Sequence, residues 1–312
     1  MRLALDIGFG HTKYAYHDGK QMIIGKIPSV VATTVENLDD LSSDVLEYDG
    51  TTYYVGNLAL KSKKKDIIEI DDYEKLETYS PLLIAQVIKE NNLTDITEIS
   101  CGLSPAHKDN NAAYKSAIEH FIISKNEYNF KISLLPQGVG AVKCIQGNID
   151  NKNFSSMKGV KDYLIVDIGF NTTDMVFVFG GNIQKGKISK DNSFENTGVT
   201  VIAKNMQDHI RKEYDKSMTI DQCLETIMKN GFLHRGEWFD MTDVVAKFKY
   251  EYAKQTMNFL EKNYGDEFDN MEKVCFVGGG AYFIDKNYAK NIEVFENSEY
   301  MNVIGNLIFD NK

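Results

Sequence analysis

Two aspartates occupy equivalent places in a repeated tetrad, each after an apolar run and before small or hydroxyl residues. The tetrad Asp-Ile-Gly-Phe occurs at Asp6–Phe9 within LALDIGFGHTKYAY and again at Asp167–Phe170 within LIVDIGFNTTDMVF. The copies are separated by about half of the 312 residues of the chain. A repeat at this spacing predicts two related halves that carry the same loop.

The residues of both tetrads suit phosphate chemistry. Each glycine is predicted at the tip between two strands, where it lets the backbone approach a ligand and present N–H groups to an anion. Lys13 adds a positive charge for a phosphate tail. A strand-end aspartate would repel phosphate unless a divalent cation lies between them, so Asp6 and Asp167 predict Mg²⁺ held through carboxylates and waters. The alternative is two hairpin turns without a ligand, which the duplication disfavours.

Two further stretches carry candidate site residues. VCFVGGGAYF at Val274–Phe283 has three glycines after an apolar strand, which would allow a flat nucleoside to lie on the backbone, or would simply form a tight turn. In LLPQGVGAV at Leu134–Val142, Pro136 is predicted to start a helix with Gln137 on its first turn, near the positive end of the helix dipole. A glutamine there can orient an attacking water, although a neutral surface role is the simpler alternative.

Composition narrows the class of protein. The net charge of −10 disfavours direct binding to nucleic acid, and the basic run Lys61–Lys65 is predicted to be a solvated loop. No apolar run approaches the roughly 20 residues that span a bilayer, and we expect no signal peptide and no membrane anchor. The four scattered cysteines are typical of buried thiols in a reducing cytoplasm, which is the expected location.

The first half reads as a hairpin-led sheet followed by helices and strands. Period-two patterns and two Asp-Gly turns predict the first strands, and helical spacing predicts the helices. The predicted strands are Leu3–Leu5, Thr12–His17, Gln21–Ile27, Val45–Tyr48, Thr51–Val55, Ile96–Leu103 and Tyr128–Leu135. The predicted helices are Tyr79–Lys89, Asn110–Ile123 and Gln137–Ile145. The polar stretch GNIDNKNFSSMKG follows as the best boundary between domains.

The second half has a similar order of predicted elements. Predicted strands are Leu164–Ile168, Thr173–Phe179, Ile183–Ile188 and Val274–Val277, and predicted helices are Val199–Tyr214, Thr219–Met228 and Thr242–Tyr264. Both halves therefore indicate α/β domains with mixed sheets.

The order of these motifs resembles that of the actin/sugar-kinase/heat-shock ATPase superfamily. DIGFGHTK and DIGFNTTD would be its two phosphate loops, and VGGGA at Val277–Ala281 its adenosine motif. KIPSVVA at Lys26–Ala32, YYVGNLAL at Tyr53–Leu60, CGLSP at Cys101–Pro105, NTGVT at Asn196–Thr200 and the ending NSEYMNVIGNLIF look like bacterial and archaeal actin-like proteins of the ParM/StbA plasmid-segregation type. The resemblance covers essentially the whole chain.

The resemblance implies an actin-like (ribonuclease H-like) fold with a nucleotide cleft between two domains. Domain I would be residues 1–157, with the closing helix 297–312 returning to it, and domain II would be residues 158–296. Asp6 and Asp167 would hold Mg²⁺ through water, and both aspartates and Gln137 would be catalytic. The implied nucleotide-binding residues are Gly8, Phe9, Gly10, His11, Thr12, Lys13, Gly169, Asn171, Thr172, Thr173, Gly198, Gly278, Gly279, Gly280 and Tyr282. Asn171 departs from the glycine of actins, and Phe9 and Phe170 are bulkier than usual.

The resemblance implies an ATPase, using ATP or GTP with Mg²⁺, whose filaments move plasmids through a DNA-binding adaptor protein. The partners would be further copies of the chain and that adaptor, with no direct nucleic acid. A small-molecule kinase of the same superfold is one alternative, although Leu134–Val142 lacks the aspartate that such kinases use as a base. A non-hydrolysing actin-like scaffold is the other alternative. Lys61–Leu76 is a candidate for the filament interface, or a plain solvated loop.

Overall fold

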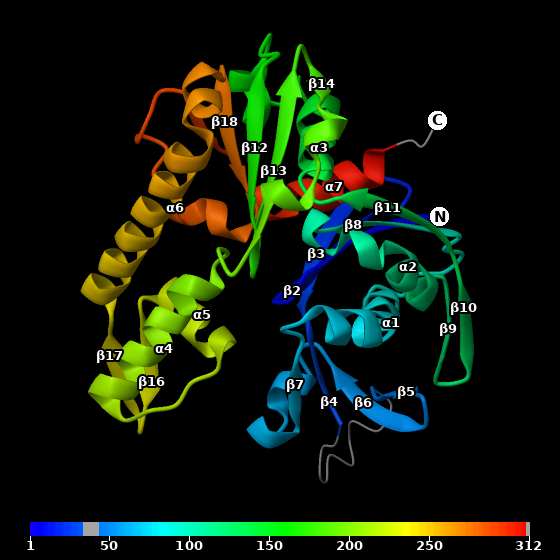
Figure 1. The fold of residues 1–312 in the computed structure, drawn as a ribbon. Coiled ribbons are helices and arrows are strands. Elements are labelled where there is room, and N and C mark those ends of the chain that lie inside the picture. Colours follow the sequence, from blue (N-terminus) through cyan, green and yellow to red (C-terminus); the bar gives the residue numbers. More distant parts are fainter. Residues whose placement is uncertain (34–43, 310–312) are drawn as a thin grey trace. The chain divides into compact units, whose positions relative to one another are not determined.

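The computed structural model describes residues 1–33 and 44–309, and the chain forms two compact units (Figure 1). The first contains Met1–Ser156, Ile188–Asn192 and Tyr300–Lys312, and the second contains Met157–Lys187 and Ser193–Glu299. Each unit has its own buried apolar core. Within the described ranges, no helix has the length and apolar character needed to cross a membrane.

The first unit is built on a mixed five-stranded sheet in the order β11-β8-β1-β2-β3. The strands β1 (Arg2–Ile7), β2 (His11–His17) and β3 (Met22–Pro28) are antiparallel, and β8 (Glu98–Leu103) and β11 (Lys131–Pro136) continue the sheet in parallel. Successive side chains of a strand point to opposite faces of the sheet. Leu3 and Leu5 therefore lie on one face of β1, and Ala4 and Asp6 lie on the other.

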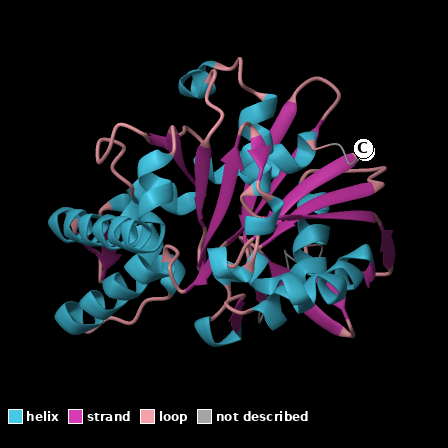
Figure 2. Ribbon diagram, turned by 45° about the horizontal axis from the view of Figure 1, so that its top comes forward, coloured by secondary structure: helices cyan, strands magenta, loops and turns pink. Residues whose placement is uncertain are grey.

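Helices cover both faces of this sheet (Figure 2). α1 (Tyr73–Glu90) and α2 (Asn111–Glu119) pack into the core that contains Leu3 and Leu5. α7 (Met301–Ile308) packs on the other face against Ala4 and Ala15, and α3 (Val139–Gly147) lies beside α7. Small side chains on β1 and β2 thus admit α7 to the face on which Asp6 stands.

Smaller elements complete the first unit. Four short strands form a sheet in the order β5-β6-β4-β7, and two more form a separate hairpin. They are β4 (Val30–Ala32), β5 (Leu46–Tyr48), β6 (Thr51–Val55), β7 (Ile67–Glu69), β9 (His120–Ile123) and β10 (Asn126–Asn129). The 3-10 turns are η2 (Ala59–Lys61), η3 (Lys64–Asp66), η4 (Pro105–Asn110), η5 (Lys152–Met157) and η7 (Lys190–Asn192).

The second unit repeats the plan of the first around a sheet in the order β14-β13-β12-β18-β19, with β15 pairing with β13. Its strands are β12 (Tyr163–Ile168), β13 (Thr172–Phe179), β14 (Asn182–Ile183), β15 (Ser193–Glu195), β18 (Lys273–Val277) and β19 (Ile292–Val294). Its helices are α4 (Thr200–Tyr214), α5 (Ile220–Lys229) and α6 (Thr242–Asn270), beside a hairpin of β16 (Gly231–His234) and β17 (Glu237–Asp240). The 3-10 turns are η6 (Lys185–Lys187), η8 (Gly279–Phe283) and η9 (Ser298–Tyr300).

The two copies of the tetrad occupy the same position in the two units. β1 pairs antiparallel with β2 and parallel with β8, just as β12 pairs antiparallel with β13 and parallel with β18. The registers also correspond, because Asp6 lies opposite Lys13 and Asp167 lies opposite Asp174. The repeat in the sequence is therefore a repeat of a strand–loop–strand unit.

The structure corrects several predicted boundaries in the first half. α1 begins at Tyr73 rather than Tyr79, because the Asp72 side chain accepts the Lys75 N–H and caps an earlier turn. The predicted helix Asn110–Ile123 ends at Glu119, and the predicted strand Tyr128–Leu135 is two strands, β10 and β11. The cause is a hairpin of β9 and β10, whose turn at Ser124 and Lys125 has positive φ angles.

The prediction of a strand over Ile183–Ile188 is largely wrong. Only Asn182 and Ile183 pair with β13, and the chain then enters η6 at Lys185. The hairpin of β16 and β17 was not predicted from the sequence. It forms around Arg235 and Gly236, which both have positive φ angles.

Candidate functional site

The first loop is a tight reversal between β1 and β2. The Gly8 N–H donates to the His11 carbonyl at 3.1 Å, and the Gly10 carbonyl accepts the Ser29 N–H at 3.0 Å. A side chain at residue 8 would place its Cβ 3.2 Å from the His11 carbonyl oxygen, a tight contact that favours glycine in this turn. The tip is therefore fixed by backbone bonds.

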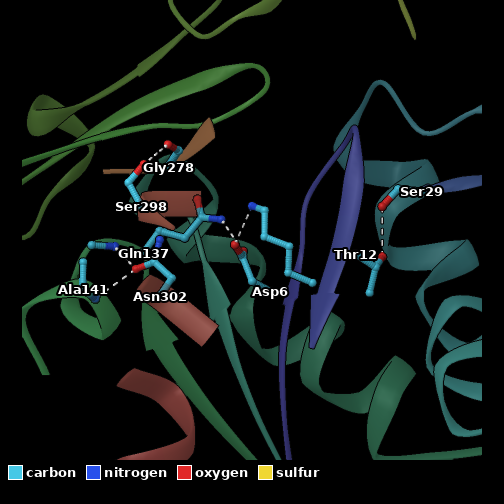
Figure 3. Close-up of polar contacts among 10 residues, drawn as sticks. Asp6, Thr12, Ser29, Gln137, Ala141, Gly278, Ser298 and Asn302 are labelled. Carbon is cyan, nitrogen blue, oxygen red and sulfur yellow. Dashed lines mark hydrogen bonds and ion pairs between the residues drawn. The ribbon is translucent and has the colours of Figure 1, made fainter. Parts of the chain in front are cut away.

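Asp6 is the centre of a polar cluster behind this tip. Its carboxylate is 3% exposed and accepts hydrogen bonds from Lys13 Nζ at 3.0 Å and from Gln137 Nε2 at 3.2 Å (Figure 3). Residues predicted from two separate motifs, DIGFGHTK and LLPQGVGAV, thus meet in one place. A cation and a neutral amide each satisfy one carboxylate oxygen, which stabilises the buried charge.

The charge of Asp6 also acts on the strand behind it. The pKa of the Cys101 thiol is raised to about 12, mainly by burial and to a lesser extent by the nearby Asp6 carboxylate. Cys101 lies on β8 and is fully buried. The thiol therefore stays protonated and serves as an apolar packing group.

Thr12 and Phe9 take positions away from this cluster. Thr12 is fully buried, and its hydroxyl shares a 2.9 Å hydrogen bond with the Ser29 hydroxyl on the side of β2 opposite Lys13. The Phe9 ring meets the His107 ring edge-on at 6.2 Å and packs against the core. These two side chains therefore make contacts within the first unit that stabilise the loop.

Gln137 reaches Asp6 from a turn between strand and helix, not from the first turn of a helix as predicted. Pro136 is the last residue of β11, and the Gln137 N–H extends the parallel ladder by donating to the Leu103 carbonyl at 3.0 Å. Gly138 then reverses the chain with a φ of 82°, and α3 begins at Val139. The prediction failed because ladder pairing with β8 outweighed the helix-starting tendency of Pro136.

A residue that the sequence did not single out holds this turn. Asn302 of α7 is 5% exposed, and its Oδ1 accepts the Gly138 N–H at 3.1 Å and the Ala141 N–H at 3.2 Å (Figure 3). The only hint in the sequence was negative. Glycine at the N-cap offers no side-chain oxygen, so the acceptor for the first turn must come from elsewhere in the chain.

The second loop is anchored on the start of α4. Its Gly169 N–H donates to the Thr172 carbonyl at 2.9 Å, and the Gly169 and Phe170 carbonyls accept the N–H groups of Val199 and Thr200 at 3.1 and 2.9 Å. A Cβ at Gly198 would lie 2.5 Å from the Phe170 carbonyl oxygen and 2.6 Å from that of Gly169. Gly198 is therefore needed for the loop to approach α4.

Beside this loop lie two buried carboxylates. Asp167 and Asp174 are opposite each other on β12 and β13 and are 4% and 1% exposed. Asp174 accepts hydrogen bonds from the Thr172 hydroxyl at 3.1 Å and from the Ser193 hydroxyl. Asp174 occupies the position that Lys13 has in the first loop, and the sequence analysis did not name it because it is the last residue of the DIGFNTTD motif. Thr173 is also buried, and Asn171 accepts two N–H groups with its backbone carbonyl.

The glycine turn after β18 lies against the end of β12. Gly278 has a φ of 80°, and a Cβ there would lie 2.6 Å from Asp167 Oδ1. Its N–H donates to the Ser298 carbonyl at 3.1 Å, and its carbonyl accepts the Ser298 hydroxyl at 3.2 Å (Figure 3). A Cβ at Gly280 would collide with Ile168, whereas Gly279 faces open space. Tyr282 follows in η8 and is exposed.

The metal-binding capacity of these residues is limited to small sets of carboxylates. Across residues 1–33 and 44–309, no group of three or more His, Cys, Asp or Glu side chains could hold a metal ion. Mg²⁺ commonly binds through one or two carboxylates and keeps several waters. Hard carboxylate oxygens at Asp6 and Asp167 fit that mode of binding, and a dedicated protein cage for a metal is not found in these ranges.

Comparison with known protein families divides the chain into two matched parts. Residues 4–140 match the family model of the N-terminal domain of actin-like proteins, and residues 165–290 match the C-terminal model of the archaeal actin homologue described as MreB-like. No curated protein sequence matches the chain. The two family matches cover most of the chain between them and confirm the predicted resemblance.

Solved structures share the fold over nearly the whole chain. A 15-stranded ParM filament from Clostridium botulinum is 18% identical with a TM-score of 0.74, covering 98% of this chain and 97% of that one. An archaeal actin homologue in complex with ADP is 20% identical with a TM-score of 0.75 and the same coverage. Bacillus thuringiensis ParM with ATP is 17% identical with a TM-score of 0.64, covering 97% and 96%. These likenesses confirm the predicted actin-like fold with two related domains.

Proposed function

This chain belongs to the actin-like proteins, and on that basis we propose that it hydrolyses a nucleoside triphosphate and assembles into filaments. The observation that carries the proposal is the cluster in which the Asp6 carboxylate accepts hydrogen bonds from both Lys13 and Gln137. A buried acid, a cation and an amide donor beside a glycine loop are the groups that phosphate chemistry needs.

We assign nucleotide binding to both tetrad loops and to the glycine turn at Gly278–Gly280. The support is chemical, because the loops offer backbone N–H groups and Lys13 offers a charge for phosphate oxygens. It is also comparative, since solved relatives of the same fold hold ADP or ATP. The preferred nucleotide is ATP or GTP.

We assign Asp6 and Asp167 to a Mg²⁺ ion held largely through waters. When bound, the ion supplies charge neutralisation between these carboxylates and the phosphates. Lys13 then orients the phosphate tail and Gln137 orients the attacking water through its side-chain amide. Glutamine is too weak a base to remove a proton, so its contribution is position rather than proton transfer.

We propose that the filaments act on cargo through a DNA-binding adaptor protein, as part of plasmid segregation in the cytoplasm. One of the solved relatives is a ParM filament, which supports self-assembly as the mode of action. The net charge of −10 opposes direct contact with DNA phosphates, so a separate adaptor would make that contact.

The proposal is tested by adding ATP with Mg²⁺ to the purified protein and following 90° light scattering together with phosphate release. We expect scattering to rise with nucleotide and to decay as phosphate is released. Hydrolysis without any scattering, stimulated by a small metabolite, would instead indicate a kinase. Scattering without phosphate release would indicate a non-hydrolysing scaffold.

Two variants separate binding from chemistry in the same assay. Gln137→Ala should slow phosphate release by roughly 100- to 1,000-fold, the range seen when a single polar group that stabilises a transition state is removed, while polymerisation persists. Asp167→Ala should abolish binding of the Mg²⁺–nucleotide complex. Unchanged affinity in Asp167→Ala, or equal loss of both activities in Gln137→Ala, would contradict the roles assigned to these residues.

A further inference from the structure

The turn that presents Gln137 depends on a side chain from the C-terminal helix. Asn302 lies on α7, and its Oδ1 accepts two backbone N–H groups, those of Gly138 and Ala141. Gly138 follows Gln137 directly as the N-cap of α3, and Ala141 lies in the first turn of that helix. Asn302 thus performs the capping that a local residue performs at most helix starts.

Nothing local can replace this acceptor. The first four N–H groups of a helix have no acceptor within the helix, and Gly138 at the N-cap position has no side chain. Without the Asn302 side chain, the N–H groups of Gly138 and Ala141 would lose the acceptor to which both donate. An unsatisfied buried donor costs on the order of 1–3 kcal/mol, so the turn would rearrange to satisfy it.

The position of Asn302 is itself tightly fixed. Gly140 of α3 and Gly305 of α7 meet so closely that a Cβ at Gly305 would collide with the Gly140 backbone. Arg2 anchors the end of α7 by donating to the Phe309 carbonyl at 2.5 Å, and it also bonds Glu98 at 3.0 Å. The two helices therefore hold Asn302 in a set place relative to the Gln137 turn.

We propose that Asn302 is a positioning residue for the hydrolytic step, which it serves by fixing the turn that carries Gln137. The inference rests on the role proposed above for Gln137. The Gln137 backbone is held on one side by Leu103 and on the other by the Gly138 bond to Asn302, and its amide meets Asp6 at 3.2 Å. A displacement of about 1 Å at such a group can cost on the order of 100-fold in rate.

The test removes the acceptor while keeping the shape of the side chain. Asn302→Leu should lower kcat for phosphate release by at least about tenfold, because Gln137 loses its fixed position. The KM for ATP with Mg²⁺ should stay within about twofold, since the tetrad loops and the glycine turn are unchanged. Asn302→Ala is the second variant, because a smaller side chain fits if leucine prevents folding.

Two matched variants control for general damage to α7. Asn302→Asp keeps an oxygen acceptor near the positive helix start and should bring kcat back to within about threefold of the wild type. Asn306→Leu makes the same substitution one turn later on α7. Asn306 is 1% exposed, and its side-chain amide has no hydrogen-bond partner among the described residues, so this change removes no acceptor from the Gln137 turn and kcat should fall much less than in Asn302→Leu.

A readout that does not depend on activity follows the turn directly. Amide hydrogen exchange at Gly138 and Ala141 in the nucleotide-free protein should become at least about tenfold faster in Asn302→Leu. Exchange at these amides should stay slow in Asn302→Asp and in Asn306→Leu. Equal exchange in Asn302→Leu and the wild type would overturn the inference.

The outcomes distinguish failure of the inference from failure of the proposed function. Wild-type phosphate release in Asn302→Leu, together with slow release in Gln137→Ala, would overturn the positioning role alone. Wild-type release in Gln137→Ala would overturn the role of Gln137 and the inference with it. If both hold, the double variant should be no slower than Gln137→Ala, because the two changes remove one function.

Discussion

At the scale of single residues, the first loop contains two paired groups with opposite effects on a bound phosphate, the Asp6 carboxylate and the Lys13 ammonium group. The carboxylate accepts from Lys13, whose side chain is 16% exposed, and from the neutral amide of Gln137. A buried carboxylate so close to a phosphate loop repels the phosphate, while the lysine attracts it. The balance between them is expected to depend on whether a divalent cation is present.

Asp6→Asn should therefore separate metal-dependent from metal-independent binding of nucleotide. The amide keeps the shape of the side chain but lacks the charge, so the affinity for ATP with Mg²⁺ should fall about tenfold, or roughly 1.4 kcal/mol. The affinity for ATP in EDTA should be unchanged or higher, because Lys13 is released from its ion pair. Titration calorimetry under both conditions measures the difference, and an equal loss in both would argue against a metal role for Asp6.

At the scale of elements, a hairpin that is determined by its own turn residues could be predicted from the sequence, whereas a helix start that depends on distant residues could not. Asp49 and Gly50 take positive φ angles between β5 and β6, and the hairpin was predicted from that dipeptide. The start of α3 was not predicted correctly. It depends on the hydrogen bond between Gln137 and Leu103 and on the cap from Asn302, and both partners come from distant parts of the chain. The motifs allow candidate residues such as Gln137 to be proposed from the sequence, whereas the distant residues that support them could not be predicted.

The meeting of α3 and α7 explains why both helices contain a glycine that weakens them intrinsically. Gly305→Ala should lower the free energy of unfolding by about 1–3 kcal/mol or more, because its methyl group would collide with the Gly140 backbone. A matched change is Gly265→Ala in α6, where nothing lies within 4 Å of the added Cβ.

Gly265 directly follows a kink at Tyr264, whose φ of −140° is not helical, so the Gly265→Ala control should leave the free energy of unfolding within about 1 kcal/mol of the wild type. Urea denaturation of both variants measures the contrast. Similar stability of the two alanine variants would show that α7 shifts freely on α3, which would also weaken the positioning role of Asn302.

At the scale of the whole molecule, the backbone of the tetrad unit is duplicated, but the residue opposite the tetrad aspartate differs between the copies. The same strand–loop–strand unit with a parallel third strand occurs in both units. The first copy sets Asp6 opposite a lysine, and the second sets Asp167 opposite another carboxylate, Asp174. The repeated tetrad could predict the shared backbone, but the difference depends on one cross-strand position that lies outside it.

Because both units contain buried thiols, we expect the free energy of unfolding to fall as the pH rises into the alkaline range. Burial raises the pKa of Cys101 and of Cys144 to about 12 from an ordinary value of 9.0, and it raises the pKa of Cys275 as well. Above pH 9 the unfolded chain loses these protons while the folded chain keeps them. The stabilisation is complete below pH 9 and is lost as the pH rises toward 12, by up to about 1.4 kcal/mol per thiol and pH unit.

Cys101→Ala isolates this effect within the first unit. Alanine should lower the free energy of unfolding at neutral pH, because a buried group is lost, but it should make the decline between pH 9 and 10.5 shallower than in the wild type. Urea denaturation at several pH values measures the slope, and labelling with a thiol reagent at pH 8 should find the native thiols unreactive. An equal slope in both proteins would mean that the Cys101 thiol ionises as readily in the folded protein as in the unfolded chain, and the packing around β8 would then have to admit water.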